Sequence, residues 1–160
     1  MDFVLYGLIA LVVILGVYLV GAYNGFVASR NKVEEAFSTM DVYLIKRSDL
    51  IPNLVETVKG YAKHEKETLE NVIKARNSAV SAVSAEDKIK AAGEVSGMLS
   101  RLFALAESYP DLKANTNFQD LMAQLKVVEE DIANARKYYN GIVRQYNTSI
   151  EVFPANIVAN

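Results

Sequence analysis

Residues 3–22 read FVLYGLIALVVILGVYLVGA, a run of twenty residues without a charged side chain, and no charge follows before Arg30. At 1.5 Å of rise per residue, a helix of this length spans roughly 30 Å, which is the thickness of the hydrocarbon core of a bilayer. The stretch therefore predicts one transmembrane anchor over residues 1–23. Aromatic side chains that suit the headgroup layer lie near both ends of the run: Phe3, Tyr6, Tyr18 and Tyr23.

A cleaved secretory signal is the alternative interpretation of this stretch, because Val20, Gly21 and Ala22 are small enough for a cleavage position. A signal peptide begins with basic residues and has an apolar region of roughly 7–15 residues. This chain has Asp2 at its start and a longer apolar run, so a retained anchor is favoured. The chain contains no cysteine, which excludes disulfides, thiol chemistry and cysteine acylation.

The charges that flank the anchor indicate its orientation. Arg30 and Lys32 follow the apolar run, whereas Asp2 precedes it. Because basic residues favour the cytoplasmic side, we expect the N-terminus outside and the C-terminal part in the cytoplasm. No ionisable residue lies within the run, so transport of ions or protons by this helix is not expected.

The rest of the chain predicts one all-α domain over residues 24–150, followed by a tail over residues 151–160. Apolar residues recur at every third or fourth position from Arg30 to Ile150, and the alternation typical of strands is missing. We expect an antiparallel bundle of three long helices, or of four if the chain reverses near Pro52. The near balance of 17 Lys and Arg against 19 Asp and Glu predicts no nucleic-acid partner.

Capping patterns predict where the later helices begin. Ser84 lies three residues before Asp87, as in a capping box, and opens a helix that Pro110 ends. Thr116 lies three residues before Gln119 and opens the last long helix.

Pro52 is the irregularity in the first amphipathic helix. A proline inside a helix removes a hydrogen bond and costs about 3 kcal/mol, so it either kinks the helix or ends it. Only Ser48 and Asp49 nearby favour a reversal, and the apolar register passes through this region undisturbed. A kinked continuous helix from Tyr23 to about Val80 is therefore favoured, and a hairpin that completes a four-helix bundle within one chain stays open.

A continuous first helix predicts self-association. It would be about 85 Å long, whereas the second helix reaches back only about 35 Å. Part of its apolar face would then be exposed unless other copies covered it in a coiled-coil manner. This self-association stripe consists of Val33, Phe37, Met40 and Leu44. With the hairpin, a monomer suffices.

No residue pattern predicts catalysis. His64 is the only histidine, and a metalloprotease helix would need a second histidine where Thr68 stands. A serine nucleophile would also need a histidine partner. Neighbouring carboxylates such as those of residues 129–131 are interpreted as solvated helix faces. We therefore expect no catalytic, cofactor-binding or metal-binding residues, and we do not expect an enzyme.

Polar residues that weaken helix interiors recur along the predicted helices. They are interpreted as a hydrogen-bonded network that sets the register between helices, with a partner-binding polar surface as the alternative. This predicted polar network consists of Asn31, Asp41, Asp49, Asn53, Arg136, Asn140 and Asn147.

Three segments closely resemble the LemA family of bacterial membrane proteins. They are residues 23–79, which contain the specific string DLIPNLVETVKGYA at 49–62, then ARKYYNGIVRQYN at 135–147 and FPANIVA at 153–159. The resemblance implies a single-pass anchor in the bacterial cytoplasmic membrane, an outward N-terminus and a cytoplasmic helical bundle. It also implies an association with membrane M48-type metalloproteases and, in some members, with magnetosome formation. It supplies no catalytic residues.

These observations together favour a membrane-anchored, homo-oligomeric helical scaffold without catalytic activity, which presents a polar surface to other membrane proteins. One alternative is a monomeric adaptor or regulator of a membrane metalloprotease. Another is an envelope-organising protein that remodels membranes, which requires the tail at residues 153–158 to re-enter lipid. Six residues with a proline cannot span a bilayer. The expected partners are a second copy of the chain, the lipid bilayer and an M48-type metalloprotease.

Overall fold

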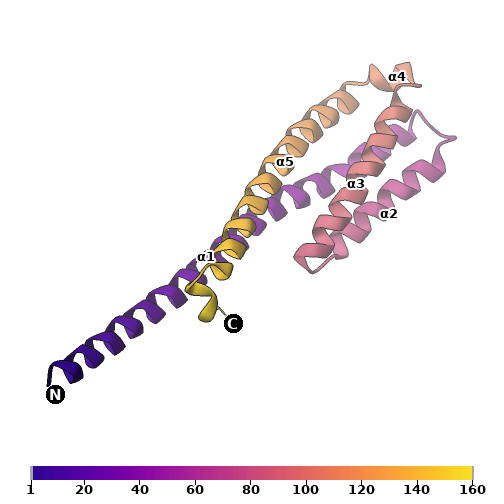
Figure 1. Ribbon diagram of the computed structural model, residues 1–160. Helices are drawn as coiled ribbons and strands as arrows, with labels where there is room; N and C mark the ends of the chain where they lie inside the picture. The colour runs from indigo at the N-terminus through magenta and orange to yellow at the C-terminus, as the bar shows by residue number, and fades with distance from the viewer. Residues whose placement is uncertain (1, 160) are drawn as a thin grey trace. The chain divides into compact units, whose positions relative to one another are not determined.

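The computed structural model describes residues 2–159, which form five α-helices and one short 3-10 helix, with no strand among them. The predicted all-α class is therefore confirmed. Met1 and Asn160, the outer ends of the predicted anchor and tail, lie outside the described residues. The elements are α1 (Asp2–Lys59), α2 (Lys66–Ser81), α3 (Ala85–Ala106), α4 (Pro110–Lys113), α5 (Thr116–Glu151) and the 3-10 helix η1 (Ala155–Ile157) (Figure 1).

The chain divides into two compact units. The central unit is Thr39–Asn134, and the terminal unit combines the residues up to Ser38 with those from Ala135 onward. Helices α1 and α5 each contribute residues to both units. The predicted division into residues 1–23, 24–150 and 151–160 rests on hydropathy and stays a prediction.

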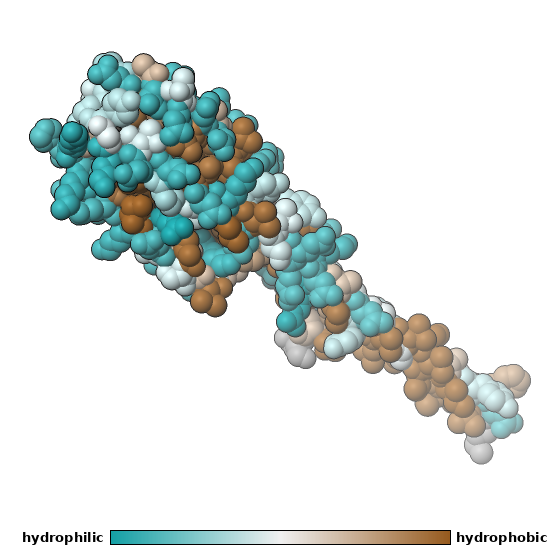
Figure 2. Space-filling model, turned by 180° about the vertical axis from the view of Figure 1, so that it is seen from behind, coloured by the Kyte–Doolittle hydropathy of each residue, from teal (hydrophilic) through white to brown (hydrophobic). Residues whose placement is uncertain are grey.

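In the terminal unit, the first part of α1 is an exposed apolar surface. Its large apolar side chains between Phe3 and Val20 are exposed, from 38% for Tyr18 to 92% for Phe3. Figure 2 shows hydrophobic side chains covering this end of the chain. Within residues 2–159, α1 is the one helix that is long and apolar enough to cross a membrane. It is a candidate membrane span.

The central unit has a continuous hydrophobic core. The end of α1, the pair α2 and α3, and the beginning of α5 supply its side chains. Helices α2 and α3 lie side by side as an antiparallel pair (Figure 1). Burying each large apolar side chain contributes about 1.5–3 kcal/mol. The core includes Ile51, Leu54, Val58, Leu69, Val72, Val95, Leu99, Leu102, Leu121 and Leu125.

The chain reverses between α1 and α2, and here the sequence prediction was wrong. Helix α1 ends at Lys59 instead of continuing to about Val80, and α2 begins at Lys66. The turn buries Ala62, whose amide donates to the carbonyl of Val58 at 2.8 Å. The apolar spacing fits a straight helix and a hairpin equally well. The hairpin forms because it buries the side chains of α2 on the same core as those of α1.

Pro52 lies inside α1, and the helix continues through it, so the predicted continuity at this residue is confirmed. Pro52 has no amide hydrogen to donate to the carbonyl of Ser48, four residues earlier. The Nε of Arg76 on α2 donates to that carbonyl instead, at 3.2 Å. Because Ser48 is buried, this replacement satisfies an acceptor that water cannot reach.

The predicted helix starts agree with the structure. The Oγ of Ser84 accepts a hydrogen bond from the amide of Asp87 at 3.0 Å and caps α3. Helix α5 begins at Thr116, but its cap is Asn115, whose Oδ1 accepts from the amide of Phe118 at 2.9 Å. The second predicted helix ends before Pro110, which opens the short α4.

Candidate functional site

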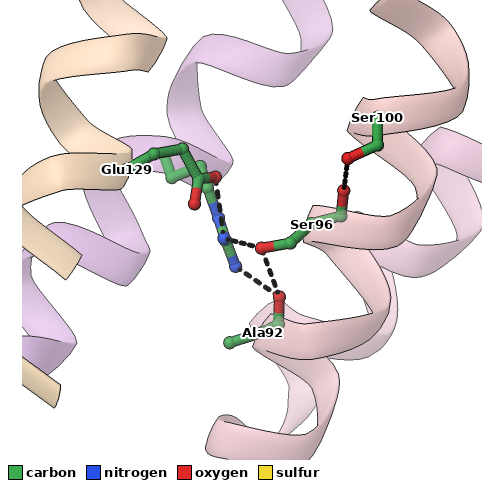
Figure 3. A network of polar contacts seen from close by, with 5 residues as sticks. Ala92, Ser96, Ser100 and Glu129 are labelled. Carbon is green, nitrogen blue, oxygen red and sulfur yellow. Dashed lines mark hydrogen bonds and ion pairs between the residues drawn. The ribbon is translucent and has the colours of Figure 1, made fainter. Parts of the chain in front are cut away.

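A buried arginine joins three helices in the central unit. Arg47, on α1, is 1% exposed. Its Nη1 donates to the Oγ of Ser96 on α3 at 2.8 Å and to the Oε1 of Glu129 on α5 at 2.9 Å. Its Nη2 donates to the carbonyl of Ala92 at 3.0 Å. Figure 3 shows Ala92, Ser96 and Glu129 turned toward the same guanidinium group.

This arrangement holds helices in place. A charge in a core is tolerated when it is paired and hydrogen-bonded, and Glu129 provides the opposite charge. The Nε of Arg47 is buried and has no hydrogen-bond partner within residues 2–159. A second ion pair joins α1 to α3 nearby, where the Nζ of Lys88 lies 2.6 Å from the Oδ2 of Asp41. The two pairs fix the register of α1 against α3 and α5.

Sequence reasoning missed this cluster. Glu129 was interpreted as part of a solvated face, yet it is only partly exposed and faces Arg47. The available signal was Arg47 itself, which occupies an apolar step of the α1 pattern between Leu44 and Ile51. The partner could not be chosen from the sequence, because several carboxylates occur along α5.

The predicted polar network is placed mostly on the surface. Among its members, Asp41 pairs with Lys88 on another helix, and Arg136 is partly buried with an Nε that has no hydrogen-bond partner within residues 2–159. The remaining members are exposed, so they do not set register through buried hydrogen bonds: Asn31, Asp49, Asn53, Asn140 and Asn147. Their use as a partner-binding surface stays a prediction.

The premise for the self-association stripe is wrong at two of its residues. Met40 is 0% and Leu44 is 8% exposed, so the chain itself buries them. Val33 and Phe37 are partly buried, and the Phe37 ring contacts that of Tyr139 edge-on, with centroids 5.7 Å apart. The prediction considered only the length of α3, whereas α5 has 36 residues and extends about 54 Å. Self-association itself stays a prediction.

The remaining predicted residues lie on the surface. The aromatic side chains assigned to the membrane interface are exposed by 38–92%: Phe3, Tyr6, Tyr18 and Tyr23. His64 is exposed in the turn before α2. Within residues 2–159, no group of three or more His, Cys, Asp or Glu is placed to hold a metal ion.

Tyr109 directly precedes α4, and its side chain links this part of the chain to the turn before α2. Its hydroxyl donates to the Oε1 of Glu65 at 3.2 Å. Partial burial and then the neighbouring carboxylate of Glu65 raise the pKa of Tyr109 above its ordinary value. The hydroxyl therefore stays a donor, which suits a positioning role.

Two apolar grooves are open on the central unit, and hydrophobic patches are visible between the hydrophilic residues in Figure 2. The smaller groove has a volume of about 610 Å³ and lies between α3 and α5, with Phe103 and Met122 in its lining. The larger groove has a volume of about 900 Å³ and is lined by the end of α1, the following turn and α2; we call it the α1–α2 groove. Its apolar floor is Val55, Ala62, Leu69 and Ile73, and its basic rim is Lys59, Lys63, Lys66 and Lys74.

The fold and these sites define a class of protein: a helical bundle whose first helix is also a candidate membrane span. The model of the LemA family matches residues 36–160, and the chain belongs to this family. The resemblance of the sequence segments is thereby confirmed.

Two relatives show how far the similarity extends. The chain is 24% identical over 158 residues to Protein LemA of Metamycoplasma hominis, which covers 98% of this chain and 72% of that protein. It is 26% identical over 163 residues to Magnetosome protein MamQ 2 of Paramagnetospirillum magneticum, and this matched region covers 86% of this chain and 60% of that protein.

Proposed function

We propose that this chain is a membrane-anchored helical adaptor without catalytic activity, which binds other membrane proteins through its central unit. The observation that carries the proposal is α1. The helix begins with an exposed apolar stretch and ends by contributing Ile51, Leu54 and Val58 to the core of the central unit. The candidate membrane span and these core residues therefore belong to the same α-helix.

The central unit supports binding to proteins. Its interior is filled with apolar side chains and with the partnered guanidinium of Arg47. Two open grooves at its surface, the α1–α2 groove and the smaller one between α3 and α5, have apolar floors. Open apolar grooves between helices suit partner helices, as in helix-in-groove recognition.

An adaptor accounts for the structure better than the homo-oligomeric scaffold that the sequence favoured. The scaffold depended on an uncovered stripe on α1, and Met40 and Leu44 in that stripe are buried within one chain. A membrane M48-type metalloprotease is the first partner to test, because the family resemblance implies it. The basic residues Arg30 and Lys32 support an anchor in the bacterial inner membrane with the central unit on its cytoplasmic side.

Cross-linking in native membranes tests the proposal. The full chain carries an affinity tag, and its lysines are cross-linked before detergent extraction; an unrelated single-pass protein with the same tag is the control. We expect adducts with other membrane proteins that the control does not give, and we expect an M48-type metalloprotease among them. Adducts that contain only copies of this chain would replace the adaptor by the homo-oligomer. A chain that stays without adducts at native abundance would contradict both.

A further inference from the structure

One side of the α1–α2 groove is a helix face long enough to bind another helix. The α2 residues that line it recur at every third and fourth position from Lys66 to Ser81, the full length of the helix. This spacing is that of one face of a helix which packs against another helix. At 16 residues, α2 provides a face about 24 Å long.

The floor and the end of the groove differ in chemistry. Leu69, which is buried in the core, and the partly buried Ile73 lie on the floor in the first half of α2, and the aliphatic stems of the rim lysines extend this apolar surface. Asn77, Ser78 and Ser81 follow near the end of α2, where small polar side chains allow a partner backbone to come close.

The rim of the groove is positively charged. Four lysines line it against one acidic residue, Glu70. Lys66 lies 3.6 Å from Glu70, and Lys59 lies 3.8 Å from Glu56, in exposed pairs that contribute little. None of the ion pairs within residues 2–159 involves Lys63 or Lys74, so their charges remain available to a ligand.

We propose that the α1–α2 groove binds an acidic amphipathic helix of a partner protein, with apolar residues on the floor and Glu or Asp beside the rim lysines. This inference rests on the proposed adaptor function and names the chemistry of its partner. A single anionic lipid or fatty acid fits less well, because it carries one headgroup, whereas the rim lysines Lys66 and Lys74 lie two helical turns apart on α2.

Peptide binding to the full chain tests the proposal. The chain is held in nanodiscs of zwitterionic lipid, with empty nanodiscs as the blank, and fluorescence anisotropy follows a labelled 18-residue helix with leucines at every third or fourth position and flanking glutamates. We expect this peptide to bind, to bind more weakly at higher salt, and to bind better than a scrambled peptide or one with lysines in place of the glutamates.

A charge-reversal pair assigns the binding to the groove. Lys63→Glu with Lys74→Glu is expected to weaken binding about tenfold or more, since two attractions become repulsions. The matched control, Lys46→Glu with Lys90→Glu, makes the same change in net charge at exposed lysines outside the groove and is expected to change binding less than about twofold. Thermal unfolding by circular dichroism verifies that both variants fold.

A photo-reactive residue at Asn77, in the groove, is expected to cross-link the peptide, and one at Lys90 is not. The proposal falls if the two charge variants behave alike or if the lysine-flanked peptide binds as well. It also falls if Asn77 cross-links mainly to a second copy, or if only phosphatidylglycerol vesicles or oleate occupy the groove. If the wild-type chain does not bind the peptide but still gives cross-linked adducts with other membrane proteins, only the assignment of the groove is overturned. If those adducts are absent, the adaptor function is overturned.

Discussion

At the scale of single residues, Arg47 determines how the central unit tolerates a buried charge. Its guanidinium contacts α3 and α5 from α1, and the carboxylate of Glu129 is its one ionic partner within residues 2–159. A buried charge that loses its partner costs several kcal/mol, because neither water nor another group replaces the lost interaction. The stability of a core that three helices share therefore depends in part on the Arg47–Glu129 contact.

Glu129→Ala is expected to lower the free energy of unfolding by about 2–3 kcal/mol, less than for a fully buried pair because the Glu129 side chain is 36% exposed. Urea unfolding followed by circular dichroism measures the change. Glu130→Ala, at the exposed neighbouring residue, is the matched control and should stay within about 0.5 kcal/mol of the wild type. Equal effects of the two substitutions would show that the Arg47 contact contributes no stability.

Tyr109 gives the stability a dependence on alkaline pH. Its pKa is raised in the folded chain, by partial burial and by Glu65, so the folded state keeps the proton more firmly than the unfolded state does. The stabilisation is fully present below the unfolded pKa of about 10 and is lost as the pH rises through the folded pKa. The free energy of unfolding should therefore fall less steeply above pH 10 in Tyr109→Phe than in the wild type.

Urea unfolding at several pH values between about 9 and 11 measures this difference. Glu65→Gln keeps a hydrogen-bond acceptor but removes the negative charge that raises the pKa of Tyr109. Its pH dependence should lie between those of the wild type and Tyr109→Phe. The same slope in all three proteins would contradict the assignment.

The residues also show where sequence reasoning stopped. Arg47 interrupts an apolar pattern, which is a signal in the sequence, but its partners lie 45–82 positions along the chain and no local pattern selects them. The exposed asparagines of the predicted polar network were chosen by residue type alone. Residue type does not tell which side of a helix faces the core when the helix direction changes.

At the scale of elements, local sequence signals predicted where helices begin better than they predicted where the chain reverses direction. Ser84 was found because its hydroxyl and the amide of Asp87 are three residues apart, and this contact needs no tertiary structure. The reversal between Lys59 and Lys66 carries Gly60 as its one turn-forming residue. Its cause is the shared core of α1 and α2, which is a long-range effect.

Pro52 and Arg76 illustrate how one element repairs a defect in another. Arg76→Met removes the donor that serves the buried carbonyl of Ser48, and we expect a loss of about 1–3 kcal/mol in the free energy of unfolding. In a Pro52→Ala background, the new amide can donate to that carbonyl as in an ordinary helix. In that background, Arg76→Met should lower the free energy of unfolding by less than it does in the wild type.

A double-mutant cycle measured by urea unfolding tests this coupling, which should exceed about 0.5 kcal/mol. Arg101→Met, at an exposed arginine of α3, is the matched control and should be additive with Pro52→Ala. Additivity of Arg76→Met with Pro52→Ala would mean that Arg76 does not compensate for the proline.

At the scale of the whole molecule, α1 combines two surfaces that need different surroundings. Its first part exposes nearly every large apolar side chain, whereas its last part buries Ile51, Leu54 and Val58 in the core of the central unit. This contrast was predictable from composition, because an uninterrupted apolar run and a three-and-four spacing differ in the sequence itself. Which face of the later helices stays open for partners depends on packing and was not predictable.

The apolar run is expected to retain the protein in the membrane, and lysines at its centre should release it. Leu11→Lys with Leu15→Lys places two charges in the middle of the run, at about 2.5–3.5 kcal/mol each for insertion, because a charged side chain loses its hydration in lipid. Alkaline carbonate extraction of membranes should leave the wild type in the pellet and move the variant largely to the supernatant. Val42→Lys with Ile45→Lys, at exposed apolar positions of the same helix in the central unit, should stay in the pellet. A variant that still resists extraction would show that another segment holds the protein in the membrane. Measurement of the intact mass of the wild type distinguishes a retained anchor from a cleaved signal peptide.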